Sequence, residues 1–327
     1  MEIFLYSFIF IIALFLIPLN INKKEIATFL IIFIYPIVIR FSGFDYDMEI
    51  YADFVEYRYI DLAEIYYLKE IGFWGSLYIL GSIFSPKIAF IILDYFILFL
   101  IYRIFKNIQI NEAYILIILI FFPTILGFKN IYRNFLAITL ILYAISITNK
   151  SFLKSFLITF FAISVHNTSI LFSPLILFTN KRNSRIYKII AIIATASLFY
   201  LLNVFFENFT EYSDSQLSSG FDFSLIYSLL TFILFMLILI ISNFYKSKQF
   251  GIISISLYIF CLSISSTVLP SSISERISLM CLYILMPFLL KIIFDMRWKH
   301  KPSLIFFLIL MIGIPIFVTP SIYSFIV

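Results

Sequence analysis

Long runs of apolar residues, separated by short polar segments, follow one another along the whole chain. Within each run the apolar residues are continuous instead of alternating with polar ones, which favours helices over the strands of a membrane barrel. The runs approach the length of about 20 residues that a helix needs to cross a bilayer. The pattern predicts spans at about 3–21, 26–41, 71–85, 88–105, 112–127, 132–148, 186–206, 224–245, 250–269, 276–294 and 303–320.

Composition agrees with this pattern, because 63% of the 327 residues are hydrophobic and only 13% are charged. A soluble domain of this size cannot bury so much apolar surface. The first run has no small-residue cleavage site after it, so we interpret it as a retained span. The sequence therefore predicts an all-α polytopic membrane protein with about 11–13 transmembrane or re-entrant helices, built as a single transmembrane domain over 1–327.

A further apolar stretch, 152–178, is interrupted near its middle by polar residues that include His166. Its two arms are about 14 residues each, or roughly 21 Å as helix, which is short of the roughly 30 Å hydrocarbon core. Basic residues flank the stretch on both sides. We expect a short helical hairpin with His166 near its outer tip.

The orientation follows from lysine and arginine in the short loops, because short loops rich in these residues are mostly cytoplasmic. The cytoplasmic cations are then Lys23, Lys24, Lys150, Lys154, Lys181, Arg182, Arg185, Lys188, Lys246, Lys248, Arg297, Lys299 and Lys301. Two long acidic loops, at about 42–70 and 207–223, fall on the outer side.

Between the loop at 42–70 and Lys150 lie four apolar runs, although an odd number must cross. The run at 112–127 is short and contains Pro123, and we favour it as the re-entrant segment. The alternative is 71–85, which is short and contains three glycines. Keeping 71–85 as a full span leaves Arg103 and Lys106 outside, against the charge rule.

Four cationic or titratable side chains gather at the outer face in this topology, namely Arg40, Arg133, His166 and Arg276. Taken alone, each arginine is explained as well by an anchoring role as by a functional one, since its long side chain can extend the charge to the membrane–water interface. Anchoring cations belong mostly on the cytoplasmic side, however. Because guanidinium groups grip phosphate oxygens bidentately, Arg133 and Arg276, with Arg40 as a third, predict a diphosphate-binding site.

His166 lies in the polar sequence "SVHNTS". It is either a residue that caps the hairpin turn, or a base or phosphate contact, since imidazole titrates near neutral pH. Asp45 is the other candidate base, and both stand as the predicted catalytic groups.

The loop that follows Arg40 combines acids and aromatic residues at helical spacing. Four carboxylates share one helical face (Asp45, Glu49, Asp53 and Glu56), and an aromatic and apolar face lies beside it (Tyr46, Ile50, Phe54 and Tyr57). One interpretation is an amphipathic helix on the membrane, with acids to water. In the other, Tyr46, Asp47 and Tyr51 bind sugar, and Gly43 lets the backbone turn sharply out of the span.

Several other chemistries find no support. Both cysteines lie in apolar runs, and the two histidines are far apart in sequence. No metal cluster is predicted, although a Mg²⁺ or Mn²⁺ site at Asp45 and Asp47 is conceivable. No Gly-rich phosphate loop or nucleophile elbow occurs. We expect no cofactor and no nucleic-acid partner.

Three stretches in order resemble the Wzy/EpsG-type polysaccharide polymerases of bacterial membranes. They are "RFSGFDYDMEIYADF" at 40–54, "GFKNIYRNFLAITLILYAI" at 127–145 and "KSFLKSFLITFFAISVHNTSILFSPLILF" at 150–178, with "ERISLMCLY" at 275–283 similar to a late arginine segment. The first has an arginine and glycine followed by acids and spaced tyrosines, the second an arginine-led span, and the third a histidine with small polar residues and proline.

The resemblance implies a GT-C-like membrane glycosyltransferase in the bacterial plasma (inner) membrane, with its active site facing the periplasm or exterior. Such enzymes join oligosaccharide repeat units carried on undecaprenyl diphosphate, which is the leaving group. The implied products are O-antigen, capsule or exopolysaccharide, and the implied partners are the bilayer, a flippase and a chain-length regulator. Neither a metal nor a nucleotide sugar is implied.

A membrane acyltransferase would need a His-based site near a loop, which the single His166 supports poorly. Two rival functions fit the same chain better. One is another GT-C transferase that uses a lipid-monophosphate sugar donor and usually a metal, which the acidic Asp45–Asp47 motif resembles. The other is a flippase or transporter for lipid-linked glycans, although such proteins tend to have repeated halves that this sequence lacks.

Overall fold

The structure is a computed structural model that describes residues 2–19, 24–44, 47–57, 69–179, 223–244, 250–296 and 299–318. Every regular element in these ranges is helical. The α-helices are α1 (Glu2–Leu16), α2 (Lys24–Ser42), α3 (Asp47–Tyr57), α5 (Ile71–Gly81), α6 (Pro86–Asn107), α7 (Ile115–Leu119), α8 (Phe122–Lys129), α9 (Tyr132–Ile147), α10 (Phe152–Val165), α11 (Leu175–Thr179), α14 (Phe223–Phe244), α15 (Phe250–Ser266), α16 (Ser271–Asp295) and α17 (Lys301–Val318). Two 3₁₀ helices, η1 (Glu112–Tyr114) and η2 (Asn167–Phe172), complete the set.

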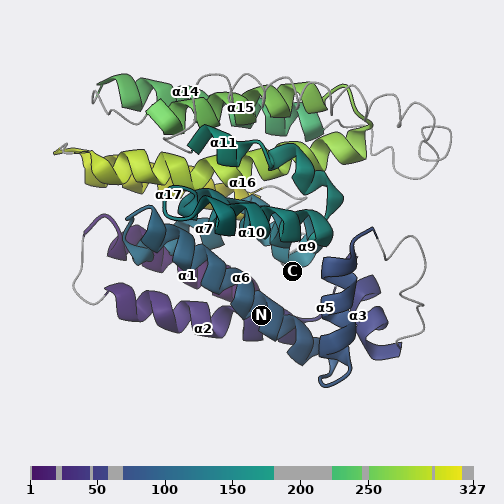
Figure 1. The fold of residues 1–327 in the computed structure, drawn as a ribbon. Helices are drawn as coiled ribbons and strands as arrows, with labels where there is room; N and C mark the ends of the chain where they lie inside the picture. Colours follow the sequence, from purple (N-terminus) through teal and green to yellow (C-terminus); the bar gives the residue numbers. More distant parts are fainter. Residues whose placement is uncertain are drawn as a thin grey trace.

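The long helices lie side by side as a bundle, with α3 and α5 gathered at one end (Figure 1). Five helices are long and apolar enough to cross a membrane: α2, α6, α14, α16 and α17, with α14 counted over 223–243 and α16 over 273–295. The remaining apolar runs that are described form shorter or bent helices. The all-α polytopic membrane architecture predicted from the sequence is therefore confirmed. The span predicted at 186–206 and the loop at 207–223 lie outside the described residues, except that α14 begins at Phe223.

The bundle has two chemically different ends. At one, the arginine end, Arg40 at the end of α2 lies with Tyr132 and Arg133 at the start of α9. At the other, the lysine end, Lys150 after α9 donates a hydrogen bond to Asn107 at the end of α6 (2.8 Å). There too Asn111 contacts Glu25 in the first turn of α2.

These contacts correct the topology of the short segments. The segment from η1 to α8 bends by 70° between Leu119 and Phe122, but it begins at the lysine end and finishes at the arginine end. It therefore connects the two ends, and the expectation that 112–127 is re-entrant is wrong. The run at 71–85 stays at the arginine end, because α5 starts beside Arg133 and its Gly81 approaches Val55 of α3.

This correction moves the cations near the end of α6 to the lysine end, while Lys87 at the start of α6 stays at the arginine end. Helix α6 runs from the arginine end to the lysine end, so Arg103 and Lys106 join Lys24, Lys150 and Lys301. Three crossings, by α6, by the bent α7–α8 segment and by α9, give the odd number that the loops require.

The predicted hairpin over 152–178 forms in part. Its first arm is the 14-residue helix α10, and His166 ends that helix in extended backbone (φ −155°, ψ 126°). The return arm differs from the expectation, since it consists of η2 and α11 instead of one helix.

Within the acidic loop, residues 47–57 fold as the amphipathic helix α3, in which Glu49, Asp53 and Glu56 are exposed as predicted. Asp45, the fourth acid of the predicted face, lies outside the described residues. The buried face differs in part from the apolar face predicted. Phe54 of that face is buried, but Ile50 and Tyr57 are exposed, and Met48, Tyr51 and Val55 pack inward. Gly43 has φ +127°, a left-handed conformation that suits glycine. The predicted sharp turn out of α2 is confirmed.

Small residues allow close approach between helices, as in other membrane bundles. Hydroxyl groups link α14, α15 and α16, where Ser263 donates to Ser228 (3.0 Å) and Ser228 contacts Ser278 (3.1 Å). Between α5 and α10, a Cβ at Gly72 would stand 2.9–3.0 Å from the backbone of Ser164. This contact is two residues from Glu70 on one side and from His166 on the other.

We predict that Gly72→Ala destabilises the protein by about 1–3 kcal/mol, because the added methyl group forces α5 and α10 apart. Gly75→Ala in the same helix is the matched control, since its Cβ would have only one neighbour, at 3.9 Å. The control should be neutral or stabilising by up to about 1 kcal/mol through helix propensity. Melting temperature in detergent measures both, and equal behaviour of the two variants would contradict the close α5–α10 contact.

Candidate functional site

Arg133 is the centre of a charged cluster at the arginine end. It lies in the first turn of α9, and its Nε donates a hydrogen bond to the hydroxyl of Tyr51 on α3 (2.9 Å). Its guanidinium lies 5.4 Å from the ring centroids of both Tyr51 and Trp74. Such aromatic contacts favour a cation and keep its planar group in one orientation.

Glu70, directly before α5, joins this arginine to the hairpin. One carboxylate oxygen forms an ion pair with Arg133 Nη1, and the other contacts His166 Nδ1. The side chain of Glu70 is 9% exposed, while those of Arg133 and His166 are 14% and 12% exposed. Glu70 thus bridges α9 and the α10–η2 break, which are separated by more than thirty residues of sequence.

His166 owes its position to the break between two helices. Its extended backbone ends α10, so the imidazole is held at the tip of the hairpin instead of along a helix face. An ionised carboxylate only accepts hydrogen bonds, so the proton of the imidazole must be on Nδ1, which donates the hydrogen bond to Glu70. The other ring nitrogen, Nε2, is then the one able to accept a proton.

Both members of this pair have shifted pKa values. Burial lowers the pKa of His166, and the charges of Arg133 and Arg276 lower it too. The hydrogen bond and charge of Glu70 raise the pKa, but the net shift is downward. Burial on its own would raise the pKa of Glu70, but the hydrogen bond and charge of His166, together with the charge of Arg133, lower it overall. At neutral pH the pair is therefore a carboxylate and a neutral imidazole.

Arg276, in the second turn of α16, approaches the same face of α3. Its Nη2 lies 3.6 Å from Asp47 Oδ2, and the two side chains are 41% and 30% exposed. Asp47 and Tyr51 are one helical turn apart, so α3 contacts both arginines. Arg276 is the more accessible of the two cations.

Tyr51 supports the cluster from a buried position. It is 4% exposed, its ring packs edge-on against Phe73 and Trp74, and burial raises its pKa to about 12. The phenol therefore stays protonated at physiological pH while it accepts from Arg133. This burial gives no support to the predicted role of Tyr51 as a platform for sugar.

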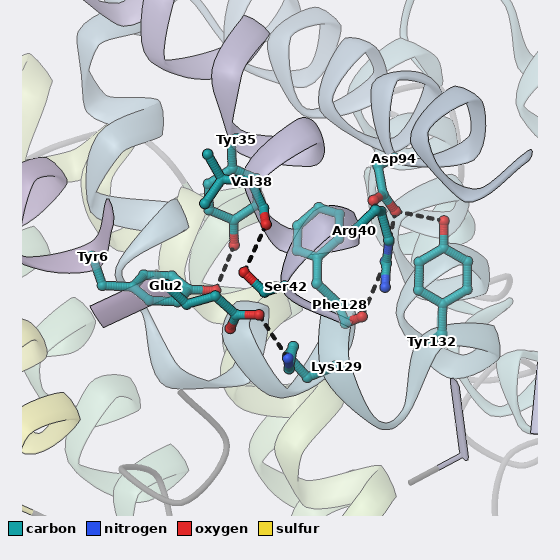
Figure 2. A network of polar contacts seen from close by, with 10 residues as sticks. All are labelled: Glu2, Tyr6, Tyr35, Val38, Arg40, Ser42, Asp94, Phe128, Lys129 and Tyr132. Carbon is teal, nitrogen blue, oxygen red and sulfur yellow. Dashed lines mark hydrogen bonds and ion pairs between the residues drawn. The ribbon is translucent and has the colours of Figure 1, made fainter. Parts of the chain in front are cut away.

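The structure does not bring Arg40 into this cluster. Arg40 is 1% exposed and forms a bidentate ion pair with Asp94 (2.6 and 2.9 Å), as Figure 2 shows. Asp45 and Tyr46 lie outside the described residues. Of the predicted site residues, Arg133, His166, Arg276, Asp47 and Tyr51 are brought together.

Sequence reasoning missed Glu70, Trp74 and Asp94. Asp94 carried a detectable signal, because it is an acid inside the apolar run 88–105 and such residues are functional or paired. Glu70 is one of many acids in an acidic loop, and nothing in its local sequence separates it from its neighbours. Within the described ranges, no group of three or more His, Cys, Asp or Glu side chains is arranged to hold a metal ion.

A groove of about 670 Å³ lies at the same end, between α3 and the turn from α5 to α6. Its lining residues include three carboxylates, two phenylalanines and one lysine, namely Glu49, Asp53, Glu56, Phe44, Phe84 and Lys87. Both the groove and the charged cluster are therefore built on α3, which carries the exposed acids on one face and Tyr51 on another.

Fold and site together define an all-α, multi-pass membrane protein with a cationic and acid–base cluster at one end of the bundle. The profile of the EpsG family matches residues 26–325, which is 300 of the 327 residues and includes every member of the cluster. The chain belongs to the EpsG family, the Wzy/EpsG type of polysaccharide polymerase, and the resemblance seen in the sequence is confirmed. No curated protein and no solved structure matches the chain.

We predict that His166 titrates below the usual histidine pKa of 6.5, and that Glu70→Gln lowers its pKa further, because Glu70 opposes the effect of burial. The chain has two histidines, so His300→Gln leaves His166 as the single histidine to observe. Nitrogen-15 NMR of the histidine-labelled protein follows the titration. A rise in the His166 pKa in Glu70→Gln would contradict the contact between the two side chains.

Proposed function

We propose that this protein polymerises undecaprenyl-diphosphate-linked oligosaccharide repeat units into a surface polysaccharide at the outer face of the plasma membrane. Membership of the EpsG family supports the broader function, membrane polysaccharide biosynthesis. The observation that carries the specific proposal is the cluster in which two arginines flank a carboxylate–histidine pair.

The arginines suit the leaving group. When the bond between the anomeric carbon and the diphosphate breaks, negative charge develops on the phosphate oxygens, and fixed cations near them stabilise the transition state. Arg133 is held in place by Tyr51, Trp74 and Glu70, while the exposed Arg276 is able to change partner from Asp47 to a phosphate. We assign these two arginines to the diphosphate.

The carboxylate–histidine pair suits the acceptor. Glu70 orients His166 through Nδ1, and Nε2 accepts the proton of the attacking hydroxyl as that oxygen bonds to the anomeric carbon. The bond from the anomeric carbon to the diphosphate oxygen breaks at the same time, and undecaprenyl diphosphate leaves with the electron pair. If base and diphosphate lie on opposite sides of the anomeric carbon, the displacement inverts its configuration.

The orientation of the bundle is compatible with an outer site. Exposed lysines and arginines of the described residues are more numerous at the lysine end (Arg103, Lys106, Lys150 and Lys154) than at the arginine end (Lys69 and Lys87). The positive-inside rule therefore supports a cytoplasmic lysine end. The cluster is at the opposite end, on the side to which lipid-linked repeat units are delivered for polymerisation.

Two rivals are less well supported. A GT-C transferase with a lipid-monophosphate donor has no evident need for two separate arginines and usually requires a metal. A flippase does not require a general base, yet the Glu70–His166 pair has the protonation states of one. Product length on defined lipid-linked repeat units, with and without EDTA, separates the first rival from a polymerase, and glycolipid translocation in proteoliposomes detects the second.

We predict that Arg133→Ala and Arg276→Ala each reduce polymerisation at least about 100-fold, the size typical for loss of a charge-stabilising group. Single lipid-linked units should accumulate while the protein remains inserted. Polymer length is measured by gel electrophoresis of lipid-linked product from purified protein in liposomes.

Arg103→Ala is the matched control for both variants, since Arg103 is an exposed arginine at the lysine end. It should retain normal chain length. Normal chains from both Arg133→Ala and Arg276→Ala would overturn the assignment to the diphosphate.

We also predict that His166→Gln lowers the turnover rate by about 100- to 10,000-fold, as expected for loss of a general base. Glu70→Gln should lower it less, because the imidazole remains but loses its orienting carboxylate. The rate is measured as release of undecaprenyl diphosphate at several pH values. Activity should fall on the acidic limb of the wild-type profile as Nε2 becomes protonated, so this limb should report the His166 pKa, below 6.5. Activity above a residual level in His166→Gln would rule out the acid–base role.

A further inference from the structure

We propose that Arg40, Asp94 and Tyr132 form a positioning network that holds the turn carrying Arg133. The inference rests on the function proposed above for Arg133 and names residues that act through it without touching the ligand. Figure 2 shows the network at the arginine end, where side chains of α2, α6 and α9 converge on the end of α8.

The Arg40–Asp94 pair is sealed from solvent. Arg40 is 1% exposed and Asp94 is 0% exposed, and Arg40 Nε and Nη2 donate to the two carboxylate oxygens at 2.6 and 2.9 Å. Rings of Phe90 and Tyr132 lie 5.5 and 5.2 Å from the guanidinium. A paired fork of this kind is rigid, because each partner fixes the direction of the other.

Tyr132 transmits this rigidity to the site. Its hydroxyl donates to Asp94 Oδ1 at 2.8 Å, and Tyr132 is both the first residue of α9 and the neighbour of Arg133. The start of α9 has no side-chain cap of its own. The hydrogen bond to Asp94 therefore provides an anchor from outside the helix for the turn on which Arg133 stands.

Arg40 also holds the other side of the same turn. Its Nη2 donates to the carbonyl oxygen of Phe128 at 3.1 Å. That carbonyl lies in the last turn of α8, where intrahelical partners are missing and an unpaired group is unfavourable in an apolar environment. Asn130 and Ile131 are all that separate α8 from α9.

A second buried pair acts at the same place, because Lys129 Nζ contacts Glu2 Oε1 of α1 at 2.8 Å (Figure 2). The turn from 128 to 132 is thus tied to α1, α2 and α6 by charged or polar side chains. With its guanidinium committed to Asp94 and Phe128, Arg40 is a positioning residue instead of a third ligand of the diphosphate.

Tyr132→Phe tests the network while preserving the ion pair and the ring. Deuterium uptake by the segment 128–136 should become about fivefold faster, the size expected from loss of one hydrogen bond. The concentration of undecaprenyl diphosphate needed for half-maximal thermal stabilisation should rise by at least about threefold, because Arg133 is less well placed. The same measurements on Ser263→Ala are the control, since it removes the buried hydrogen bond from Ser263 to Ser228 (3.0 Å) between α15 and α14, and neither residue belongs to this turn or to the helices that hold it.

Unchanged uptake in Tyr132→Phe overturns the network, whatever the protein binds. Faster uptake with unchanged affinity for undecaprenyl diphosphate overturns it as well, since the turn would then not position Arg133. An equal loss of affinity in Ser263→Ala points to general loosening and has the same consequence. If the wild-type protein is not stabilised by undecaprenyl diphosphate at all, the proposed function fails, and the role of the network in that function fails with it.

Discussion

The pairing of buried charge is the constraint on which the rest of this structure depends. An arginine or a carboxylate in an apolar interior is stable only when an opposite charge and hydrogen bonds replace the water it has lost. Arg40 and Asp94 satisfy this condition for each other, and Glu70 satisfies it for Arg133. Removing one partner of a buried pair typically destabilises a protein by about 3–5 kcal/mol, so each pair also selects the helix arrangement in which its members meet.

The two charge systems at the arginine end differ in solvent contact, and this difference separates their roles. Arg40 and Asp94 are sealed, with 1% and 0% exposure. Arg133 and His166 are 14% and 12% exposed, and Arg276 is 41% exposed. A cation that binds a diphosphate must be accessible from solvent, whereas a cation that holds the backbone in place interacts more strongly when it is shielded from solvent. The buried set is therefore suited to rigid support, and in the function we propose the partly exposed set meets the substrate.

The part of the site that was predictable came from rare residues. Arg133, His166 and Arg276 stood out because cationic or titratable residues are unusual within or at the ends of apolar runs. The structure brings them together through Glu70 and helix α3. Glu70 could not be recognised in the same way, since it is one acid in an acidic segment and its partners are 63 and 96 residues away. The topology failed for a related reason. Pro123 does mark a bend, but the direction of the chain after the bend depends on contacts that local sequence does not encode.

By itself, the amino-acid sequence determined the class of the protein, most of the helices that the structure describes, the hairpin break at His166 and the turn at Gly43, because hydrophobic run length and backbone preference are local properties. Its family followed from the order of a few motifs. Only the tertiary structure decided which face of α3 is buried, which short segment connects the two ends, and which arginine is sealed with Asp94. Those outcomes are set by pairings between distant segments, where the loss of water around each charge must be compensated by one specific partner.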